Sequence, residues 1–418
     1  MDLFGRTHAA PKKFFDGTHR GVAPAETVAR YAELMRPLGI TRLADVTGLD
    51  CVGVPVVVAI RPNAKSLTVA QGKGTDRDAA RASALMESIE FWHAENIDAP
   101  LRFESHRSLL KAAATVDVDA VELQIGRRIP RDTRLLWIEG FDLVRRIPTW
   151  VPYDIVSFDS VSPLSFAPRL QADSNGLASG NSMLEALEHA ICELVERDAS
   201  TLWFAAGDDR TGKSTQLVLD SIDVDFITRA RARLADAGLL IGIYDITSDV
   251  GVPAYQCIVS DAPGNARPRG YFWGFGCHLA PSVAVTRAVT EAVQSRLSEI
   301  TGLRDDIRHG AYERGRDDVE LRAIQHDLEV PPPRRAFGSR ASLAGESFEA
   351  DVDRLVAALR GAGITSLVAV DLTKPDIGVP VVKVIAPELE GFPFGHRLGR
   401  RAHAAIAASG DPAAGAPR

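Results

Sequence analysis

Apolar and polar positions follow two recurring patterns along the chain. In three stretches apolar residues return every three to four positions, as on one face of an amphipathic helix. Elsewhere, short runs rich in Val and Ile predict buried β-strands. We therefore expect a fold that mixes helices and sheets. The three helical stretches are residues 79–95 (AARASALMESIEFWHAE), 184–200 (LEALEHAICELVERDAS) and 284–300 (AVTRAVTEAVQSRLSEI).

A unit of one helix and two strands occurs three times, at about residues 25–62, 225–261 and 350–387. Each unit has a helix closed by glycine, a strand, an Asp-x-Thr turn, a Gly-Val-Pro segment and a second strand rich in Val. The closing glycine stands where a left-handed helix C-cap is favoured. We predict an α/β (α+β) fold built from repeated α-β-β modules, in one domain over residues 1–402 with a disordered tail at 403–418.

The aspartates of the repeated turns, Asp45, Asp245 and Asp371, allow two interpretations. They could be three catalytic acids brought together by the fold. Alternatively, each side chain bonds its own backbone in an Asx turn. We favour the turn, because Asp side chains commonly bond the backbone two residues further on.

The three amphipathic helices share a pair of polar residues three positions apart. Positions i and i+3 lie on the same helical face. A single Glu-x-x-Glu is most simply a solvated or arginine-paired surface, but these pairs recur among apolar neighbours. Buried like charges are costly unless one is protonated or a hard cation such as Mg²⁺ lies between them. The pairs are Glu87 and Glu90, Glu193 and Glu196, and Glu291 and Gln294.

Segments beside these helices favour the cation and suggest phosphate groups next to it. QGKGTD (71–76) places Lys73 in a glycine-rich turn ahead of a helix N-terminus, where anions are stabilised. DSNGLASGNS (173–182) is also rich in Gly, Ser and Asn, and precedes the second acidic helix. The third helix adds Arg287, Gln294 and Arg296, and arginines hold phosphates bidentately. Carboxylates, Mg²⁺ and guanidinium groups are typical of nucleoside triphosphate chemistry.

Composition narrows the functional class. The 418 residues carry a net charge of −7, without the excess of basic residues typical of nucleic-acid binding. No apolar run reaches the length of a membrane span, and the first residues lack a signal-peptide core, so we expect a cytoplasmic protein. The four cysteines form no CxxC pair, which argues against a tetrathiolate zinc site. A homodimer is compatible with all of this.

Three motifs resemble those of the YcaO-domain family. SALMESIEF is similar to its Ser-x-x-x-Glu-x-x-Glu-Arg motif, GNSMLEALEHAICELVERD to its Asn-x-x-x-Glu…Glu-x-x-Glu-Arg motif, and EAVQSR to its Glu-x-x-Gln-x-Arg motif. The resemblance covers about residues 20–400. It implies an enzyme that uses ATP to activate a peptide backbone amide for attack by a side chain, an amine or sulfide, giving an azoline, an amidine or a thioamide.

The resemblance also implies roles for individual residues. Metal ligands would be Glu87, Glu90, Glu193 and Glu196. Contacts to nucleotide or metal would come from Arg20, Ser83, Asn181, Glu185, Arg197, Glu291, Gln294 and Arg296. Arg197 would touch phosphate or orient the acidic helix. To these the local sequence adds Lys73 as a phosphate ligand. One departure is that Glu90 is followed by Phe91 rather than arginine.

Neither a fused E1-like peptide-docking domain, on which azoline-forming members of the family commonly rely, nor a zinc tetrathiolate is evident. The resemblance therefore implies either a separate partner protein, TfuA-like or E1-like, or another branch of the family. The residues of the second motif, and the MESIEFW segment of the first, resemble those of bacterial members that work with TfuA-like proteins. This resemblance favours thioamide formation. Azoline formation, an amidine- or amide-forming ligase, and a non-catalytic nucleotide-binding scaffold remain alternatives.

Histidines and cysteines near the motifs offer no clear acid–base group. For His93 and His189, which lie on the acidic helices, we favour packing or surface roles. Cys277 and His278 are neighbours on a predicted strand, whose consecutive side chains point to opposite faces, so they do not form a nucleophile–base pair. The catalytic base is left unassigned.

Overall fold

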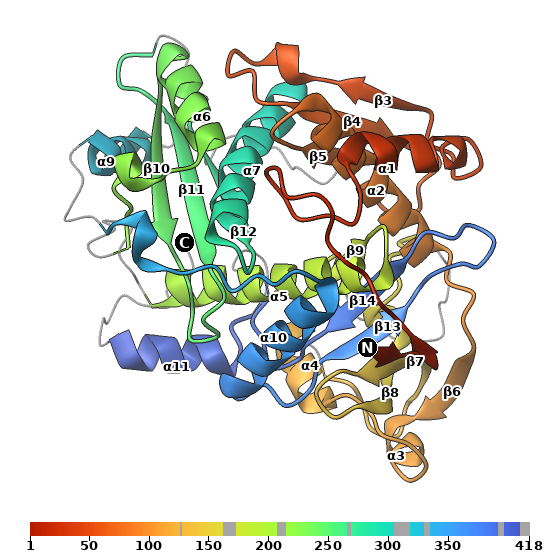
Figure 1. The fold of residues 1–418 in the computed structure, drawn as a ribbon. Coiled ribbons are helices and arrows are strands. Elements are labelled where there is room, and N and C mark those ends of the chain that lie inside the picture. Colours follow the sequence, from red (N-terminus) through yellow and green to blue (C-terminus); the bar gives the residue numbers. More distant parts are fainter. Residues whose placement is uncertain are drawn as a thin grey trace.

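Three antiparallel sheets and the helices packed on them form the core of the molecule (Figure 1). The fold is seen in a computed structural model. It describes residues 1–125, 128–161, 173–206, 215–265, 269–304, 318–329, 335–391 and 397–409.

The first two sheets have three strands each. One contains β3 (Arg42–Asp45), β4 (Val56–Ile60) and β5 (Val69–Lys73), in that order. The other contains β10 (Leu239–Asp245), β11 (Ala254–Asp261) and β12 (Tyr271–Cys277). A short pair, β1 (Asp2–Leu3) and β2 (Arg6–Thr7), lies at the N-terminus.

The third sheet has six strands and draws on three parts of the chain. Its order is β6-β7-β13-β14-β9, and β8 also pairs with β7. Its strands are β6 (Leu101–Ser105), β7 (Arg134–Asp142), β8 (Ile147–Pro152), β9 (Leu177–Ser179), β13 (Val368–Asp371) and β14 (Val381–Ile385).

The predicted helix-strand-strand units are present in the structure. Helices α1 (Pro24–Tyr31), α6 (Asp225–Asp236) and α10 (Phe348–Gly361) precede the strand pairs β3–β4, β10–β11 and β13–β14. Each unit has a glycine after its helix with positive φ, namely Gly39 (73°), Gly238 (69°) and Gly363 (85°). Glycine adopts this left-handed conformation without a Cβ penalty, which explains its recurrence there.

The repeated turns confirm the structural interpretation of their aspartates. The Oδ1 atoms of Asp45, Asp245 and Asp371 accept hydrogen bonds from the backbone N–H of the threonine two residues later, at 3.0, 3.1 and 2.9 Å. Each threonine Oγ1 in turn accepts a bond from a backbone N–H at the start of the second strand, at 3.1 to 3.2 Å. Aspartate and threonine thus fix the turn together.

A third strand and one of the three predicted acidic helices complete each unit, and the sequence pattern predicted neither this strand nor its place beside the helix. In two units they follow directly, as β5 with α2 (Arg77–Glu95) and β12 with α7 (Pro281–Thr301). In the third unit they come from earlier in the chain: β9 pairs with β14, and α5 (Met183–Ala205) follows β9. The three acidic helices α2, α5 and α7 therefore occupy equivalent positions in the three units.

Small residues bring the third strand close to its helix. A Cβ on Gly72 of β5 would lie 2.1 Å from the Ala84 nitrogen, and a Cβ on Gly276 of β12 would lie 2.1 Å from the Ala284 oxygen. Only glycine allows such close approach of strand and helix backbones. This contact sets the position of the acidic helices relative to the sheets.

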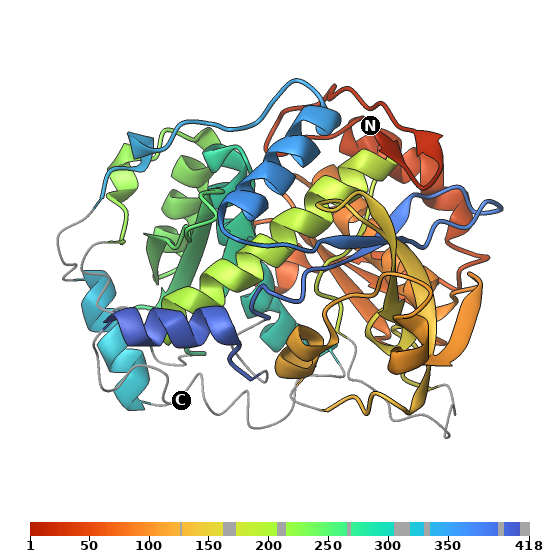
Figure 2. The ribbon, with the colours of Figure 1, turned by 90° about the horizontal axis from the view of Figure 1, so that it is seen from below.

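Helix α5 crosses the centre of the molecule, with α10 and α11 (Arg400–Ser409) packed against it (Figure 2). Helix α11 corrects the prediction of a disordered tail, which is wrong for residues 403–409. Arg401 pairs bidentately with the buried Asp198 of α5, at 2.9 Å for both bonds, and so holds the helix in place. Residues 410–418 lie outside the described residues.

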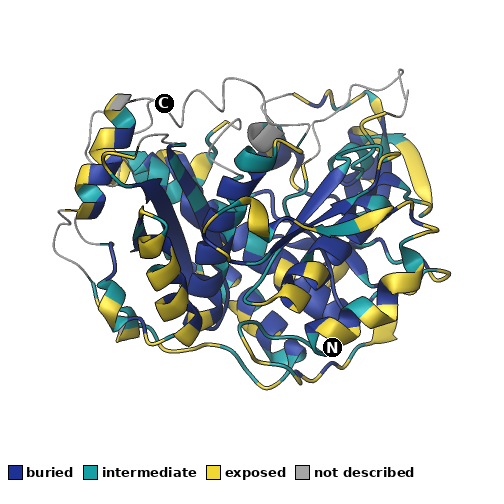
Figure 3. Cartoon of the chain, turned by 90° about the horizontal axis from the view of Figure 1, so that it is seen from above, coloured by how far each residue is buried: buried dark blue, intermediate teal, exposed yellow. Residues whose placement is uncertain are grey.

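Exposed surface is concentrated on the outer helices and loops, while the sheets and the central helices are buried (Figure 3). None of the described helices is long and apolar enough to cross a membrane. The remaining helices are peripheral: α3 (His106–Leu109), α4 (Val118–Ile125) and α9 (Asp318–Glu329).

Candidate functional site

A cavity of about 420 Å³ lies among the three acidic helices. Each helix presents the same three positions to it: the first acidic residue, the residue four before it and the residue three after it. These positions share one helical face. All nine line the cavity: Ser83, Glu87 and Glu90 of α2, His189, Glu193 and Glu196 of α5, and Arg287, Glu291 and Gln294 of α7.

Backbone groups of the third strands hold three of these carboxylates. Glu87 Oε2 accepts a hydrogen bond from the N–H of Gln71 at 3.0 Å, and Glu291 Oε1 accepts the equivalent bond from Phe275 at 3.3 Å. Glu90 Oε1 accepts bonds from both the backbone N–H and the hydroxyl of Ser179, each at 2.8 Å. The strand–helix contact therefore fixes the carboxylates before any ligand binds.

Burial makes the four predicted metal ligands unusually weak acids. Desolvation raises the pKa of Glu87, and it raises that of Glu90 well above the usual value. It raises the pKa of Glu193 and of Glu196 to about 7, although Arg197 opposes the shift. Carboxylates in this state gain from a cation that neutralises them.

Glu291 behaves differently because it is already paired. Burial alone would raise its pKa, but Lys73 and Arg197 outweigh burial and lower it. Lys73 Nζ donates a hydrogen bond to Glu291 Oε2 at 2.5 Å. Glu291 is therefore an anionic partner of Lys73 at the cavity wall.

The donor set fits a magnesium ion that is shared with phosphate groups. Within the part of the chain that the structure describes, no three acidic, histidine or cysteine side chains converge as a ready-made metal cage. Mg²⁺ is commonly held by one or two carboxylates together with waters and substrate phosphates. Lys73, Arg197 and Arg287 also line the cavity and supply the positive charge that phosphates require.

Lys73 reaches the cavity, but not through the helix N-terminus that the sequence suggested. The side chain of Asp76 caps α2 and accepts a hydrogen bond from Ala79 N at 2.8 Å. A carboxylate thus occupies the position where an anion was expected. Lys73 instead projects from β5 toward Glu291 of α7.

An N-terminal strap, residues 11–23, forms another wall and carries Arg20 into the lining. Within the strap, Phe14 and Arg20 exchange two backbone hydrogen bonds, at 3.1 and 2.9 Å. Asn181 and Glu185 are not part of the lining. Glu185 Oε2 accepts a hydrogen bond from Gly21 N at 2.9 Å, and Asn181 Nδ2 donates to Glu185 Oε1 at 3.0 Å. These two residues therefore hold the strap.

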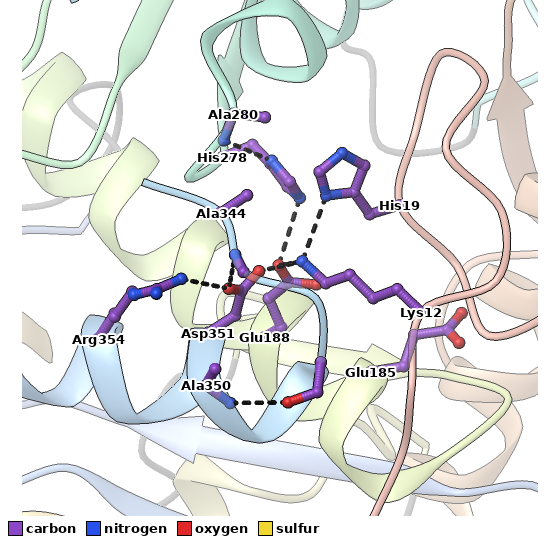
Figure 4. Close-up of polar contacts among 12 residues, drawn as sticks. Lys12, His19, Glu185, Glu188, His278, Ala280, Ala344, Ala350, Asp351 and Arg354 are labelled. Carbon is purple, nitrogen blue, oxygen red and sulfur yellow. Dashed lines mark hydrogen bonds and ion pairs between the residues drawn. The ribbon is translucent and has the colours of Figure 1, made fainter. Parts of the chain in front are cut away.

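A buried polar cluster anchors the strap to the other end of the chain (Figure 4). Lys12 forms an ion pair with Asp351 of α10, and both side chains are fully buried. Lys12 also donates to His19 Nδ1 at 3.2 Å and lies 3.7 Å from Glu188 of α5. His278 Nε2 lies 3.3 Å from the same glutamate oxygen.

Arg296, a predicted nucleotide contact, lies away from the cavity. Its Nε donates to Asp50 Oδ2 at 3.0 Å, its Nη1 lies 3.5 Å from Asp261 Oδ1, and its guanidinium stands over the Phe272 ring. It is absent from the cavity lining. Arg296 is five positions after Glu291, so it lies on a different face of α7 from the three cavity residues.

Phe91 fills the position of the expected motif arginine and is buried against Phe158, with ring centroids 5.2 Å apart. Arg304, which the sequence reading missed, lines the cavity and acts electrostatically on Glu87. Arg287, which the sequence offered as a phosphate ligand but the family resemblance did not include, lines it too. Its spacing of four residues from Glu291 places it on the cavity face of α7, whereas nothing in the local sequence marked Arg304.

Of the remaining histidines and cysteines considered in the sequence, most have structural surroundings, as expected. His93 is buried, with Nδ1 2.8 Å from the Ile89 carbonyl oxygen. Cys277 and His278 are both buried and have different surroundings, the thiol beside Cys192 and the imidazole beside Glu188. His189 differs from the expectation, because it lines the cavity.

A family model described as YcaO cyclodehydratase, ATP- and Mg²⁺-binding, matches residues 71–390. The chain belongs to the YcaO family. The predicted family is thus confirmed, and ATP and Mg²⁺ are the family's cofactors. The chain is 36% identical over 386 residues to an uncharacterized protein in the tfuA 3′ region of Rhizobium leguminosarum bv. trifolii, covering 89% of this chain and 88% of that protein.

Two solved structures show the same fold. A heterocyclase in complex with substrate and cofactor aligns with a TM-score of 0.79 at 22% identity, covering 96% of this chain and 56% of the heterocyclase. The YcaO protein from Methanopyrus kandleri, bound with AMPPCP and Mg²⁺, aligns with a TM-score of 0.71 at 24% identity, covering 90% and 93%. This chain thus spans only about half of that heterocyclase chain.

Proposed function

We propose that this YcaO protein uses Mg²⁺ and ATP to activate a backbone amide of a peptide, so that another atom replaces the amide oxygen. The observation that carries the proposal is the cavity itself. Carboxylates with raised pKa values face it from α2 and α5, and cations face it from β5, α5 and α7. This distribution of charge suits a metal and a triphosphate bound side by side.

Residue roles follow from this geometry. Glu87, Glu90, Glu193 and Glu196 would hold Mg²⁺, and Lys73, Ser83, Arg197 and Gln294 would contact the nucleotide. Arg20 would approach from the strap, positioned by Asn181 and Glu185. ATP supplies the phosphoryl group that turns the amide oxygen into a leaving group. The protein holds the charges in place.

We favour thioamide formation with a TfuA-like partner, because the similar Rhizobium protein lies in the tfuA 3′ region. The second candidate is an azoline-forming cyclodehydratase with a separate E1-like partner. The structural likeness to a heterocyclase supports this alternative. Both activities use the same amide-activation site and differ in the nucleophile and the partner.

Calorimetric titration tests the site. Wild-type chain is expected to bind ATP or AMPPCP more tightly with Mg²⁺ than without it. Glu193→Gln should lose this magnesium dependence, because the amide carries no charge for the metal. Glu139→Gln, a change on the exposed face of β7, is the matched control and should bind as wild type does. A Glu193→Gln variant with wild-type magnesium dependence contradicts the metal assignment.

Mass spectrometry separates the two activities. The chain is incubated with Mg²⁺, ATP, a candidate peptide, sulfide and a TfuA-like protein. Exchange of oxygen for sulfur raises the peptide mass, whereas azoline formation lowers it by the mass of water. A mass decrease without sulfide would replace the thioamide assignment with the cyclodehydratase one. Phosphate release that requires an amine instead would identify an amidine-forming enzyme.

A further inference from the structure

One end of the cavity carries positive charge and a single imidazole. His189 lies on α5 one turn before Glu193, on the face that carries the cavity carboxylates. Its side chain is open to the cavity, and neither ring nitrogen bonds to a described protein group. The groups that act on it come from several elements: Arg20 of the strap, Lys73 of β5, Arg287 of α7 and His278 of the turn before α7.

The two neighbouring imidazoles, His19 and His278, contact other protein groups (Figure 4). His278 is buried, accepts a hydrogen bond from Ala280 N on Nδ1 at 2.9 Å, and directs Nε2 at Glu188. His19 accepts from Lys12 and packs edge-on against His278, with centroids 4.8 Å apart. Of the described residues that line the cavity, His189 is the only histidine.

The other ionisable groups of the lining are also occupied. The carboxylates of α2 and α5 are the proposed magnesium ligands, and Lys73 is paired with Glu291. The arginines stay protonated and cannot accept a proton. His189 is therefore the lining side chain that is free to exchange a proton at neutral pH.

The charged groups around His189 make its ability to accept a proton depend on whether nucleotide is bound. Although the ring is open to the cavity, desolvation by the protein around it, then Arg287, Arg20 and Lys73, lower the pKa of His189 well below its usual value, so the ring is neutral. The negative charge of a triphosphate would offset these cations. The basicity of His189 should then rise toward that of an ordinary imidazole when nucleotide binds.

We propose that His189 accepts the proton that the attacking nucleophile loses during amide activation. This inference rests on the proposed function and deepens it. The nucleophile forms a bond to the amide carbon, and the carbonyl π electrons move to the oxygen. The S–H, O–H or N–H proton moves to a free ring nitrogen of His189. The amide oxygen then forms a bond to the γ-phosphorus of ATP, and the bond from that phosphorus to the ADP oxygen breaks, which releases ADP. The C–O bond breaks next, and its electron pair leaves with inorganic phosphate, which takes the proton back from the imidazole. A lone pair of the amide nitrogen or of the added sulfur forms the new double bond to carbon, and in an azoline or amidine the amide nitrogen also releases its N–H proton to water.

Nuclear magnetic resonance of the full chain, with isotopically labelled imidazole nitrogens, tests the first half of the proposal. Spectra are recorded over a pH series with and without Mg²⁺ and AMPPCP. His189→Gln identifies the signal, and His403→Gln, a change at an exposed position on α11, is the control. We expect the His189 signal to stay neutral in the free chain and to titrate at higher pH in the complex.

Chemical rescue tests the second half. General-base groups contribute about 100-fold or more to rate. His189→Ala should lose at least that much peptide-dependent phosphate release while still binding Mg²⁺ and AMPPCP, and added imidazole should restore part of it. A positioning role alone would not be rescued by free imidazole.

The outcomes separate this inference from the proposed function. If the wild-type chain fails to bind Mg²⁺ with AMPPCP, the proposed function is contradicted, and so is the inference that rests on it. If the nucleotide binds but the titration of His189 does not move, or His189→Ala releases phosphate at the wild-type rate, the inference alone is overturned. Loss of nucleotide binding in His189→Gln would make His189 a nucleotide ligand and would equally overturn it.

Discussion

At the scale of single residues, the cavity is defined by carboxylates that are protonated more readily than usual. Glu193 and Glu196 both have a pKa raised by burial to about 7. A divalent cation binds the ionised form, so protonation competes with the metal. The site should therefore respond to pH across the neutral range, where ordinary glutamates do not titrate.

This competition gives a pH prediction. The affinity for Mg²⁺ with AMPPCP should rise as pH increases toward about 7 and level off above it, because both glutamates are then ionised. Calorimetry over a pH series measures the change. In Glu196→Gln the remaining dependence should be shallower. A wild-type affinity that stayed constant from pH about 5 to about 8 would contradict the raised pKa values.

The stability of the nucleotide-free chain should change in the opposite direction. The folded pKa of about 7 exceeds the ordinary value of 4.5, so the unfolded chain loses these protons first. Stability from these groups is thus complete below pH 4.5 and is lost as pH rises to about 7. Thermal unfolding of wild type and Glu196→Gln should converge at low pH, with the variant more stable at high pH. A wild type of equal or greater stability at high pH would contradict this linkage.

At the scale of elements, the decisive contact lies between the third strand of a unit and its acidic helix. Gly72 and Gly276 let the two backbones meet, and the adjacent Gln71 and Phe275 then bond Glu87 and Glu291. In both units the repeated sequence therefore lets a backbone N–H of the third strand hold the glutamate of the helix. The same helix spacing places Ser83, His189 and Arg287 at equivalent positions in the three units. Each unit therefore presents a different group there: a hydroxyl, an imidazole or a guanidinium.

A substitution at this contact should be costly. Gly72→Ala places a Cβ 2.1 Å from the Ala84 nitrogen, which the strand and helix can relieve only by moving apart. We expect a loss of about 1–3 kcal/mol or more in the free energy of unfolding, together with weaker nucleotide binding because Glu87 shifts. Denaturant unfolding and calorimetry measure the two effects.

Gly361→Ala is the matched control, because nothing lies within 4 Å of its added Cβ at the end of α10. Alanine favours helix over glycine by up to about 1 kcal/mol, so this variant should be as stable as wild type or more stable. Equal stability of the two variants would show that the close strand–helix contact is not needed.

At the scale of the whole molecule, the N-terminal strap is tied to α10 across most of the chain length. Lys12 joins Asp351 in a buried ion pair, and Ala10 and Phe348 add a backbone bond at 3.0 Å. The strap carries Arg20 to the cavity wall. A helix near the C-terminal end of the chain therefore holds the N-terminal strap, although it does not itself line the cavity.

Removal of the lysine should loosen this wall. Lys12→Met removes the buried cation beside Asp351 and Glu188 and leaves Asp351 with Arg354 at 3.5 Å. Breaking a buried ion pair typically costs about 3–5 kcal/mol. We expect a lower free energy of unfolding, and weaker binding of Mg²⁺ with AMPPCP even under conditions where the variant is folded. Lys13→Met, at an exposed neighbouring position, should change neither. If a folded Lys12→Met chain bound nucleotide with wild-type affinity, the anchoring of the strap by Lys12 would not contribute to nucleotide binding.

The sequence by itself determined the repeated units, their glycine caps and turns, and the helical faces that carry the acidic pairs. These features are local, since spacing along a helix or strand decides which side chains share a face. Tertiary structure decided which faces meet. It completed the third unit with β9 and α5 from the middle of the chain, directed Arg296 to Asp50 rather than to the cavity, and added Arg304. It also placed His189 among cations from three other elements, because the charge around a side chain depends on packing between segments that sequence spacing does not relate.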